Sequence, residues 1–337
     1  MTQTDQFVGT RPVSEAHAFD VRALSQWLAA HLDGFEGPLS VEQFKGGQSN
    51  PTFKLTAGDQ RYVLRTKPAP AAKLLPSAHA IDREYRVMDA LSKAGFPAAR
   101  QYALCLDESV IGRAFYIMEF VEGRVLWDQS LPGMTPAERS AHYDEMNRVI
   151  AQLHSLDYRA LGLESFGKPG NYFARQIDRW TRQYKAAETE HIPAMESLIE
   201  WLPKNIPDGE ITTIVHGDYR LDNMIFHPTE PRILAVLDWE LSTLGHPLAD
   251  FSYHCMSWHI EPGLFRGIAG LDLGALGIPS EDAYVAKYSE RTGITVNKQD
   301  FRFYLAYNMF RMAGILQGIM KRYQDGTAAS EQALRSG

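Results

Sequence analysis

The residues of this chain with the clearest chemical use are two aspartates and one asparagine. Asn223 stands five positions after Asp218, and Asp238 follows two short apolar runs. These runs, Met224–Phe226 and Ile233–Leu237, are separated by His-Pro-Thr-Glu-Pro, a pattern that predicts a β-hairpin. Such a hairpin would bring Asn223, before its first strand, close to Asp238, after its second strand.

These three side chains form the set that phosphoryl transfer requires. One carboxylate orients a hydroxyl and takes its proton, while an amide oxygen and a second carboxylate bind magnesium. We therefore predict that Asp218 is catalytic and that Asn223 and Asp238 are metal ligands. The alternative is a buried network of aspartate and histidine that only braces a turn.

The same residues carry a resemblance to known enzymes. The spacing HxDxxxxN around Asp218 resembles the catalytic loop of protein kinases, and the DWE that begins at Asp238 stands where they carry the metal-binding DFG. The HGD and DWE forms are similar to the aminoglycoside phosphotransferase and choline kinase family, and more closely to the kinase-like domains associated with acyl-CoA dehydrogenases. The resemblance runs from about Phe44 to the region of Phe310. It implies a protein-kinase-like fold that uses ATP and Mg²⁺.

A glycine-rich segment lies between two predicted strands. Small residues among Gly46, Gly47, Ser49 and Asn50 would let backbone amides approach phosphates. The string GGQSN also resembles the phosphate loop of the family. A plain hairpin turn is the alternative.

The resemblance implies three further contacts with the nucleotide. Arg65 stands where protein kinases carry a lysine, and it would fork onto phosphate oxygens with two donors. Glu84, on the following helix, is the implied carboxylate partner of Arg65, and the backbone of Glu119 and Val121 is implied to bind adenine. The alternatives are an exposed strand-end charge at Arg65 and a solvated helix charge at Glu84.

The residues around the catalytic loop are expected to support it. His216 is expected to brace the loop, and Asp250 resembles the buried aspartate that ties the loop down in the family. Gly217 stands where many protein kinases carry an arginine that reads activation-loop phosphorylation, so no such switch is expected. His246 departs from the usual Gly-Asp-Pro of the family, and Glu240 either reaches the metal through water or is solvated.

The remaining patterns predict the elements that position these groups. After a loose tail to about residue 13, a helix capped by Asp20, five strands and one main helix precede residue 121, which indicates a sheet-rich lobe over 1–122. Helical patterns dominate 123–337, and Thr135-Pro136-Ala137-Glu138 is a capping box. The fold class is therefore α+β and bilobal, with a larger, mostly helical second lobe. The expected strands are Val41–Lys45, Thr52–Thr56, Arg61–Thr66, Tyr102–Leu106 and Ala114–Phe120, and the main helix is Ser77–Lys93.

Composition excludes several other classes of protein. The chain has 337 residues, of which 45% are hydrophobic, and its formal net charge of −7 argues against a nucleic-acid partner. Two cysteines make neither a disulfide framework nor a metal site, and no apolar stretch has the length of a membrane span. A cytoplasmic protein without a membrane partner is expected. The spacing of His246, His254 and His259 fits no zinc motif.

The acceptor is the least determined part of the prediction. By resemblance, residues from about 156 to 210 form a helical insert that helps to bind it. Arg175, Arg179 and Arg182 form a basic stripe that faces either an anionic substrate or solvent. The string NYFARQ, which begins at Asn171, resembles the acyl-CoA-dehydrogenase-associated branch and implies a hydroxy acid or a hydroxyacyl-CoA.

We therefore predict a small-molecule kinase that moves the γ-phosphoryl group of ATP to the hydroxyl of a small molecule. Two alternatives remain open, namely an aminoglycoside O-phosphotransferase and a nucleotide-binding module without catalytic activity. The patterns do not fix the oligomeric state.

Overall fold

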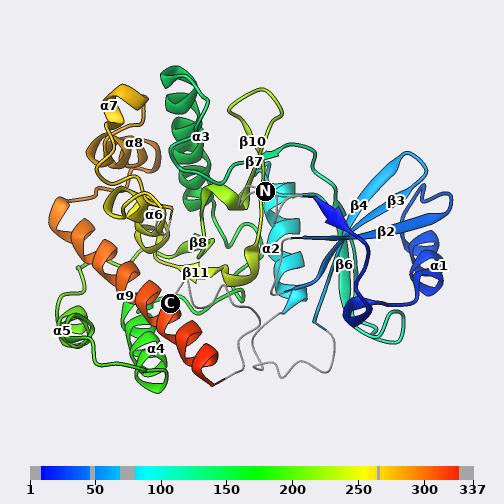
Figure 1. The fold of residues 1–337 in the computed structure, drawn as a ribbon, viewed down its shortest axis with the longest axis horizontal. Helices are drawn as coiled ribbons and strands as arrows, with labels where there is room; N and C mark the ends of the chain where they lie inside the picture. Colours follow the sequence, from blue (N-terminus) through cyan, green and yellow to red (C-terminus); the bar gives the residue numbers. More distant parts are fainter. Residues whose placement is uncertain (1–8, 46–49, 69–79, 264–265, 326–337) are drawn as a thin grey trace. The chain divides into compact units, whose positions relative to one another are not determined.

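The computed structural model describes residues 9–45, 50–68, 80–263 and 266–325 (Figure 1). Backbone contacts divide the chain into two compact units that do not follow sequence order. The hairpin after Asn223 groups with the N-terminal segment, whereas the loop that holds Asp218 belongs to the second unit. The division at residue 122 and the insert at 156–210 stay predictions about the lobes. The first unit comprises Met1–Trp127, Arg159–Phe166 and Leu221–Ser242; the second comprises Asp128–Tyr158, Gly167–Arg220 and Thr243–Gly337.

The first unit is built on an antiparallel sheet of six strands in the order β1-β2-β3-β4-β6-β5 (Figure 1). Side chains alternate between its two faces. Leu64 of β4 joins a core cluster with Leu24 and Leu28 of α1, while the next residue, Arg65, pairs with Glu84 of α2. The strands are β1 Thr10–Arg11, β2 Leu39–Phe44, β3 Thr52–Ala57, β4 Gln60–Thr66, β5 Gln101–Cys105 and β6 Phe115–Glu119, and the helices are α1 Val21–His31 and α2 Ile81–Lys93.

The predicted hairpin is confirmed in the first unit. β9 (Met224–Phe226) pairs with β10 (Ile233–Val236), and the short strand β7 (Arg124–Val125) pairs with the other edge of β9. The backbone amide of Leu237 donates to the carbonyl oxygen of Asn223 at 2.7 Å. This bond closes the open end of the hairpin, and it places the backbone of Asn223 next to the residue that precedes Asp238.

The second unit is mostly helical, with one small two-stranded sheet. β8 (Thr213–Val215) enters the loop that holds Asp218, and it pairs with β11 (Thr243–Gly245). Helix α6 (Pro247–Cys255) is buried along its whole length and packs against the long helix α9 (Lys298–Gln324). The other helices are α3 Pro136–Ser155, α4 Tyr172–Ala186, α5 Pro193–Trp201, α7 Leu273–Leu276 and α8 Glu281–Thr292, and 3₁₀ turns cover Glu15–His17, Leu202–Lys204, Leu221–Asn223, Trp239–Leu241 and Met256–His259.

Most of the predicted elements are confirmed, and so is the α+β class. Asp20 caps α1 through the amides of Arg22 and Ala23, and Thr135 forms the expected capping box at the start of α3. None of the helices in the described ranges is both long and apolar enough to cross a membrane.

One expected boundary of the first unit is wrong, and another lies outside the described residues. The loose tail is wrong at Thr10–Arg11, which pairs with Phe44 and Gln43 of β2, because pairing with a distant strand leaves no local pattern. The expected start of the main helix at Ser77 lies outside the described residues.

Gly123 allows the close approach of two backbone segments in the first unit. A Cβ atom at this position would lie 2.3 Å from the carbonyl oxygen of Phe226. We therefore expect Gly123→Ala to lower the free energy of unfolding by about 1–3 kcal/mol, as measured by urea denaturation. Gly318→Ala on α9 is the control, because the nearest atom there is 3.8 Å away and alanine favours a helix. Equal stability of the two variants would contradict this reading.

Candidate functional site

A buried arginine organises the charged groups of the first unit. The Nε atom of Arg65 lies 2.7 Å from Glu84, and its Nη2 atom lies 3.0 Å from Asp238 and 3.6 Å from Glu240. The expected pairing of Arg65 with Glu84 is therefore confirmed. Burial by itself lowers the pKa of Arg65, but the attraction of Glu84, Asp238 and Glu240 outweighs it and leaves the pKa raised. The guanidinium group stays charged.

Glu84 is held from two further directions. Its carboxylate accepts hydrogen bonds from the Nδ2 atom of Asn50 at 2.7 Å and from the hydroxyl of Tyr116 at 3.0 Å. Burial raises the pKa of Glu84, and the interactions with Arg65, Tyr116 and Asn50 act against that shift. The side chain of Asn50 thus fixes the partner of Arg65. The predicted loop residues Gly46, Gly47 and Ser49 lie outside the described residues.

The backbone at Asp238 is in a left-handed conformation, with φ of 66°. Aspartate tolerates this conformation better than most residues, and such strain is common at functional sites. The next residue, Trp239, is buried, and its indole Nε1 atom donates to the carbonyl oxygen of Val236 at 2.9 Å. Packing of Trp239 therefore fixes the backbone that presents Asp238.

The side chains proposed as metal ligands suit magnesium by type. Asn223 ends a 3₁₀ turn and is buried, while 35% of the Asp238 side chain is exposed. An amide oxygen and a carboxylate are hard oxygen ligands, which Mg²⁺ prefers. Three carboxylates, those of Glu84, Asp238 and Glu240, surround the single guanidinium group of Arg65, so acidic groups outnumber the basic one here. The residues fit the ion that the resemblance implies.

Asp218 of the second unit has a partner on each carboxylate oxygen. The hydroxyl of Tyr253 donates to Oδ1 at 2.6 Å, and Arg220 lies 3.0 Å from Oδ2. The backbone amide of Asp218 donates to the Nδ1 atom of His216 at 3.1 Å, which is the bracing contact expected of this histidine. The orientation of this carboxylate is therefore set by side chains of its own unit.

Asp250 ties down the loop that leads to Asp218, as expected. It accepts the backbone amides of His216 at 2.7 Å and Gly217 at 2.8 Å, and it lies 3.2 Å from the Nε2 atom of His154. Burial raises its pKa, but the hydrogen bond from His154 and the nearby histidines outweigh that effect and leave the pKa lowered. Gly217 has φ of 83°, a conformation that glycine adopts without strain.

His246 has a structural role at the position where the family usually carries an aspartate. It is the N-cap of α6, and its Nδ1 atom accepts a hydrogen bond from the amide of Leu248 at 3.2 Å. Burial lowers the pKa of His246 to about 4, so the ring is neutral and has a lone pair for the cap. Burial likewise lowers the pKa of His254 to about 4.

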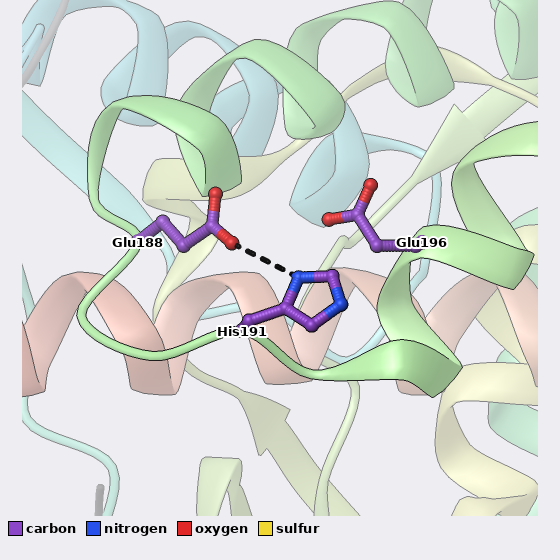
Figure 2. A group of neighbouring side chains, drawn as sticks. All are labelled: Glu188, His191 and Glu196. Carbon is purple, nitrogen blue, oxygen red and sulfur yellow. Dashed lines mark ion pairs between the residues drawn. The ribbon is translucent and has the colours of Figure 1, made fainter.

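One group of possible metal-ligating side chains lies elsewhere in the described part of the second unit. Glu188 and His191 lie in the loop after α4, Glu196 lies in the first turn of α5, and Figure 2 shows the two carboxylates flanking the ring. Lys185 forms ion pairs with both Glu188 and Glu196. Because the lysine already neutralises these carboxylates, we assign this group as a surface ion-pair cluster.

A small pocket of the second unit lies beside the partners of Asp218. Its empty volume is about 280 Å³, including the solvent at its mouth. Neither Tyr253 nor Arg266 belongs to a chemical motif, so no role was predicted for either residue. Tyr253 had one detectable signal, since it follows Asp250 by three positions on the same helix. The lining residues are Gln129, Tyr219, Arg220, Tyr253, His254, Met256, Ser257, Ile260 and Arg266.

The other predicted residues lie on accessible surfaces. Glu119 ends β6, and its amide donates to the carbonyl oxygen of Arg100 at 2.8 Å, so adenine would have to use other backbone groups there. Val121 follows the strand and is partly buried. Of the basic stripe on α4, Arg179 and Arg182 are exposed, and Arg182 pairs with Asp178 at 2.6 Å.

The fold is that of a protein-kinase-like phosphotransferase. It combines a sheet-rich first unit with a helical second unit, and each unit holds a group of charged side chains. Residues 40–290 match the model of the phosphotransferase enzyme family called APH. The match spans most of the chain, and the protein therefore belongs to this family. A solved protein of Ralstonia eutropha JMP134, provisionally assigned as an aminoglycoside phosphotransferase, is 67% identical, with a TM-score of 0.88 and coverage of 95% of this chain and 94% of its own.

More distant comparisons agree with this fold. The choline kinase of Cryptosporidium parvum Iowa II has a TM-score of 0.61 at 14% identity, with coverage of 94% of this chain and 95% of its own. Mouse acyl-CoA dehydrogenase family member 10 is 47% identical over 97% of this chain and 31% of its own length. Human member 11 is 45% identical over 94% of this chain and 41% of its own length. The chain thus spans less than half of these two relatives.

The lowered pKa values of the two buried histidines predict sensitivity to acid. Below its usual pKa of 6.5 a histidine of the unfolded chain binds a proton, whereas His246 and His254 in the folded chain bind it only near pH 4. The contribution of these two neutral histidines to the free energy of unfolding is therefore fully present above pH 6.5, and it is lost as the pH falls toward 4. We expect His246→Asn, which keeps a neutral cap, to reduce the loss between pH 7 and pH 5 by about 1–2 kcal/mol in urea denaturation.

His254→Gln is the companion variant for this measurement: because burial also lowers the pKa of His254 to about 4, this change should reduce the loss in the same direction. An identical pH dependence in wild type and His246→Asn would show that His246 does not resist protonation in the folded protein.

Proposed function

We propose that this protein transfers the γ-phosphoryl group of ATP to a hydroxyl group of a small molecule. Membership of a phosphotransferase family supports the reaction class. The observation that carries the proposal is the intact catalytic loop, in which Asp250 accepts two loop amides while Asp218 keeps both oxygens oriented. A module that only binds nucleotides has no need of an aspartate held in this way.

Each charged residue has a role in the proposed reaction. Asp218 orients the acceptor hydroxyl and takes its proton, and Arg65 binds phosphate oxygens while Glu84 holds it in place. Asn223 and Asp238 are the proposed ligands of Mg²⁺, which neutralises charge on the phosphates when bound. The roles of Gly46, Gly47, Ser49, Asn50, Glu119 and Val121 in binding the nucleotide are likewise proposals.

The pocket beside Asp218 supports an acidic acceptor over a cationic one. Arg220 and Arg266 line it, and none of the described residues that line it is acidic. Arg220 already pairs with Asp218, so the preference rests on Arg266, whose charge repels polycations such as aminoglycosides and attracts a carboxylate or a phosphate. We therefore propose a hydroxy acid or a hydroxyacyl-CoA as the acceptor, in agreement with the implied branch of the family.

The roles of the two aspartates can be tested by matched substitutions. We expect Asp218→Asn to lower acceptor-dependent ADP formation by about 10²–10⁴-fold, with nucleotide binding retained, because only the base is lost. Asp238→Ala should remove magnesium-dependent turnover, and circular dichroism should show an unchanged fold. If wild type and Asp218→Asn show the same background with every acceptor while ATP still binds, the protein is a nucleotide-binding module.

The charge of the acceptor can be tested with paired substrates. We expect turnover with a hydroxy acid or its CoA ester and little turnover with aminoglycosides or with the uncharged methyl ester of the acid. Arg266→Gln should raise KM for the acid about ten-fold and leave the weak reaction of the ester unchanged. Arg179→Gln, on the exposed stripe of α4, is the matched variant. A raised KM in Arg179→Gln alone would move the acceptor site to the stripe, and drug-dependent turnover would favour an aminoglycoside enzyme.

A further inference from the structure

Helix α6 contacts the loop that holds Asp218 at two points, and only one of them is explained by the family resemblance. Asp250 accepts the backbone amides of His216 and Gly217, while Tyr253, three residues later, donates to the Asp218 side chain at 2.6 Å. Residues three apart lie on the same face of a helix. The same face of α6 therefore holds both the backbone of the loop and the carboxylate that the loop presents.

We propose that Tyr253 is a positioning residue that fixes the orientation of the Asp218 carboxylate for phosphoryl transfer. The proposal rests on the function proposed above for Asp218. A carboxylate at the end of an aspartate rotates over a broad range, so a single partner leaves it a wide choice of orientations. With Tyr253 on Oδ1 and Arg220 on Oδ2, Asp218 is held on both sides.

The chemistry of a phenol suits this role. The Tyr253 hydroxyl is neutral, so it orients the carboxylate without adding a second positive charge beside Arg220. Burial and the charge of Asp218 raise the pKa of Tyr253, and the hydroxyl therefore keeps the proton that it donates. Arg220 by contrast brings a full positive charge to the other oxygen.

Tyr253 is itself held rigidly. Only 6% of the residue is exposed, and the Arg311 guanidinium of α9 lies 5.2 Å from the centre of its ring. The same guanidinium donates to the carbonyl oxygen of Gly217 at 2.8 Å. Arg311 thus contacts both the Tyr253 ring and the backbone of the loop that holds Asp218. These two contacts fix the position of the ring relative to the loop.

The test is a double-mutant cycle in the rate of turnover. Tyr253→Phe keeps the ring and its contact with Arg311 but removes the donor to Asp218. We expect kcat with the best acceptor to fall about ten-fold, with nucleotide affinity unchanged, because the lost hydroxyl donates to the carboxylate of Asp218. In the Asp218→Asn background the same change should have almost no effect on the residual rate. A structural defect would instead lower both rates equally.

The matched control is Tyr184→Phe. Tyr184 is buried on α4 of the same unit, and it does not line the pocket beside Asp218. This variant should retain the wild-type kcat. A wild-type kcat in Tyr253→Phe, or an equal loss in both backgrounds, would overturn the proposal.

Urea unfolding of the same four proteins separates this proposal from the proposed function. If Tyr253 holds Asp218, the midpoint of the double variant should equal that of the more destabilised single variant, whereas independent residues give additive losses. Additive losses would overturn the contact whether or not the enzyme turns over. The lack of any acceptor-dependent turnover in wild type would overturn the proposed function, and the unfolding cycle would still decide whether Tyr253 orients Asp218.

Discussion

The loop that holds Asp218 depends on one buried carboxylate. Burying a charge is costly unless donors surround it, and Asp250 meets that requirement with His154 and with the backbone amides of His216 and Gly217. Because two of the donors belong to the loop, the loop cannot leave its conformation without leaving the charge unsatisfied. The hydrogen bonds that a buried Asp250 carboxylate requires therefore set the backbone conformation of the residues that precede Asp218.

The first unit also surrounds a buried charge with groups of opposite charge, but there the buried charge is positive. There the buried charge is the guanidinium of Arg65, and carboxylates of α2 and of the segment after β10 surround it. Hydrophobic packing supplies the rigid surroundings in both units. Leu64 sits in the core opposite Arg65, and Phe251 of α6 stacks on Tyr288 with ring centres 3.8 Å apart. In both units, ion pairs and hydrogen bonds orient the charged side chains, and the apolar residues packed beside them keep the backbone in place.

Local sequence patterns predicted those strands and turns of the site that form between residues close together in the sequence. The apolar runs before Asp238 predicted the hairpin, and the strand predicted at Arg61–Thr66 corresponds to β4. The contact of Tyr253 with Asp218 had only the three-residue spacing from Asp250 as a signal, because every residue of α6 is buried and such a helix shows no amphipathic period. The strands β1 and β11 were not predicted either, because each is short and forms through pairing with a distant strand. The left-handed backbone of Asp238 is likewise set by the packing of Trp239.

The contact between Arg311 and Gly217 has a consequence for biosynthesis. The two residues are 94 positions apart, and Arg311 lies on the last described helix. A ribosome therefore releases the loop well before it makes the arginine that supports it, and such distant contacts form late in folding. A chain cut short before α9 would contain the whole HGD motif and still lack its brace. In a nascent or truncated chain, an intact motif would thus be no sign of a working enzyme.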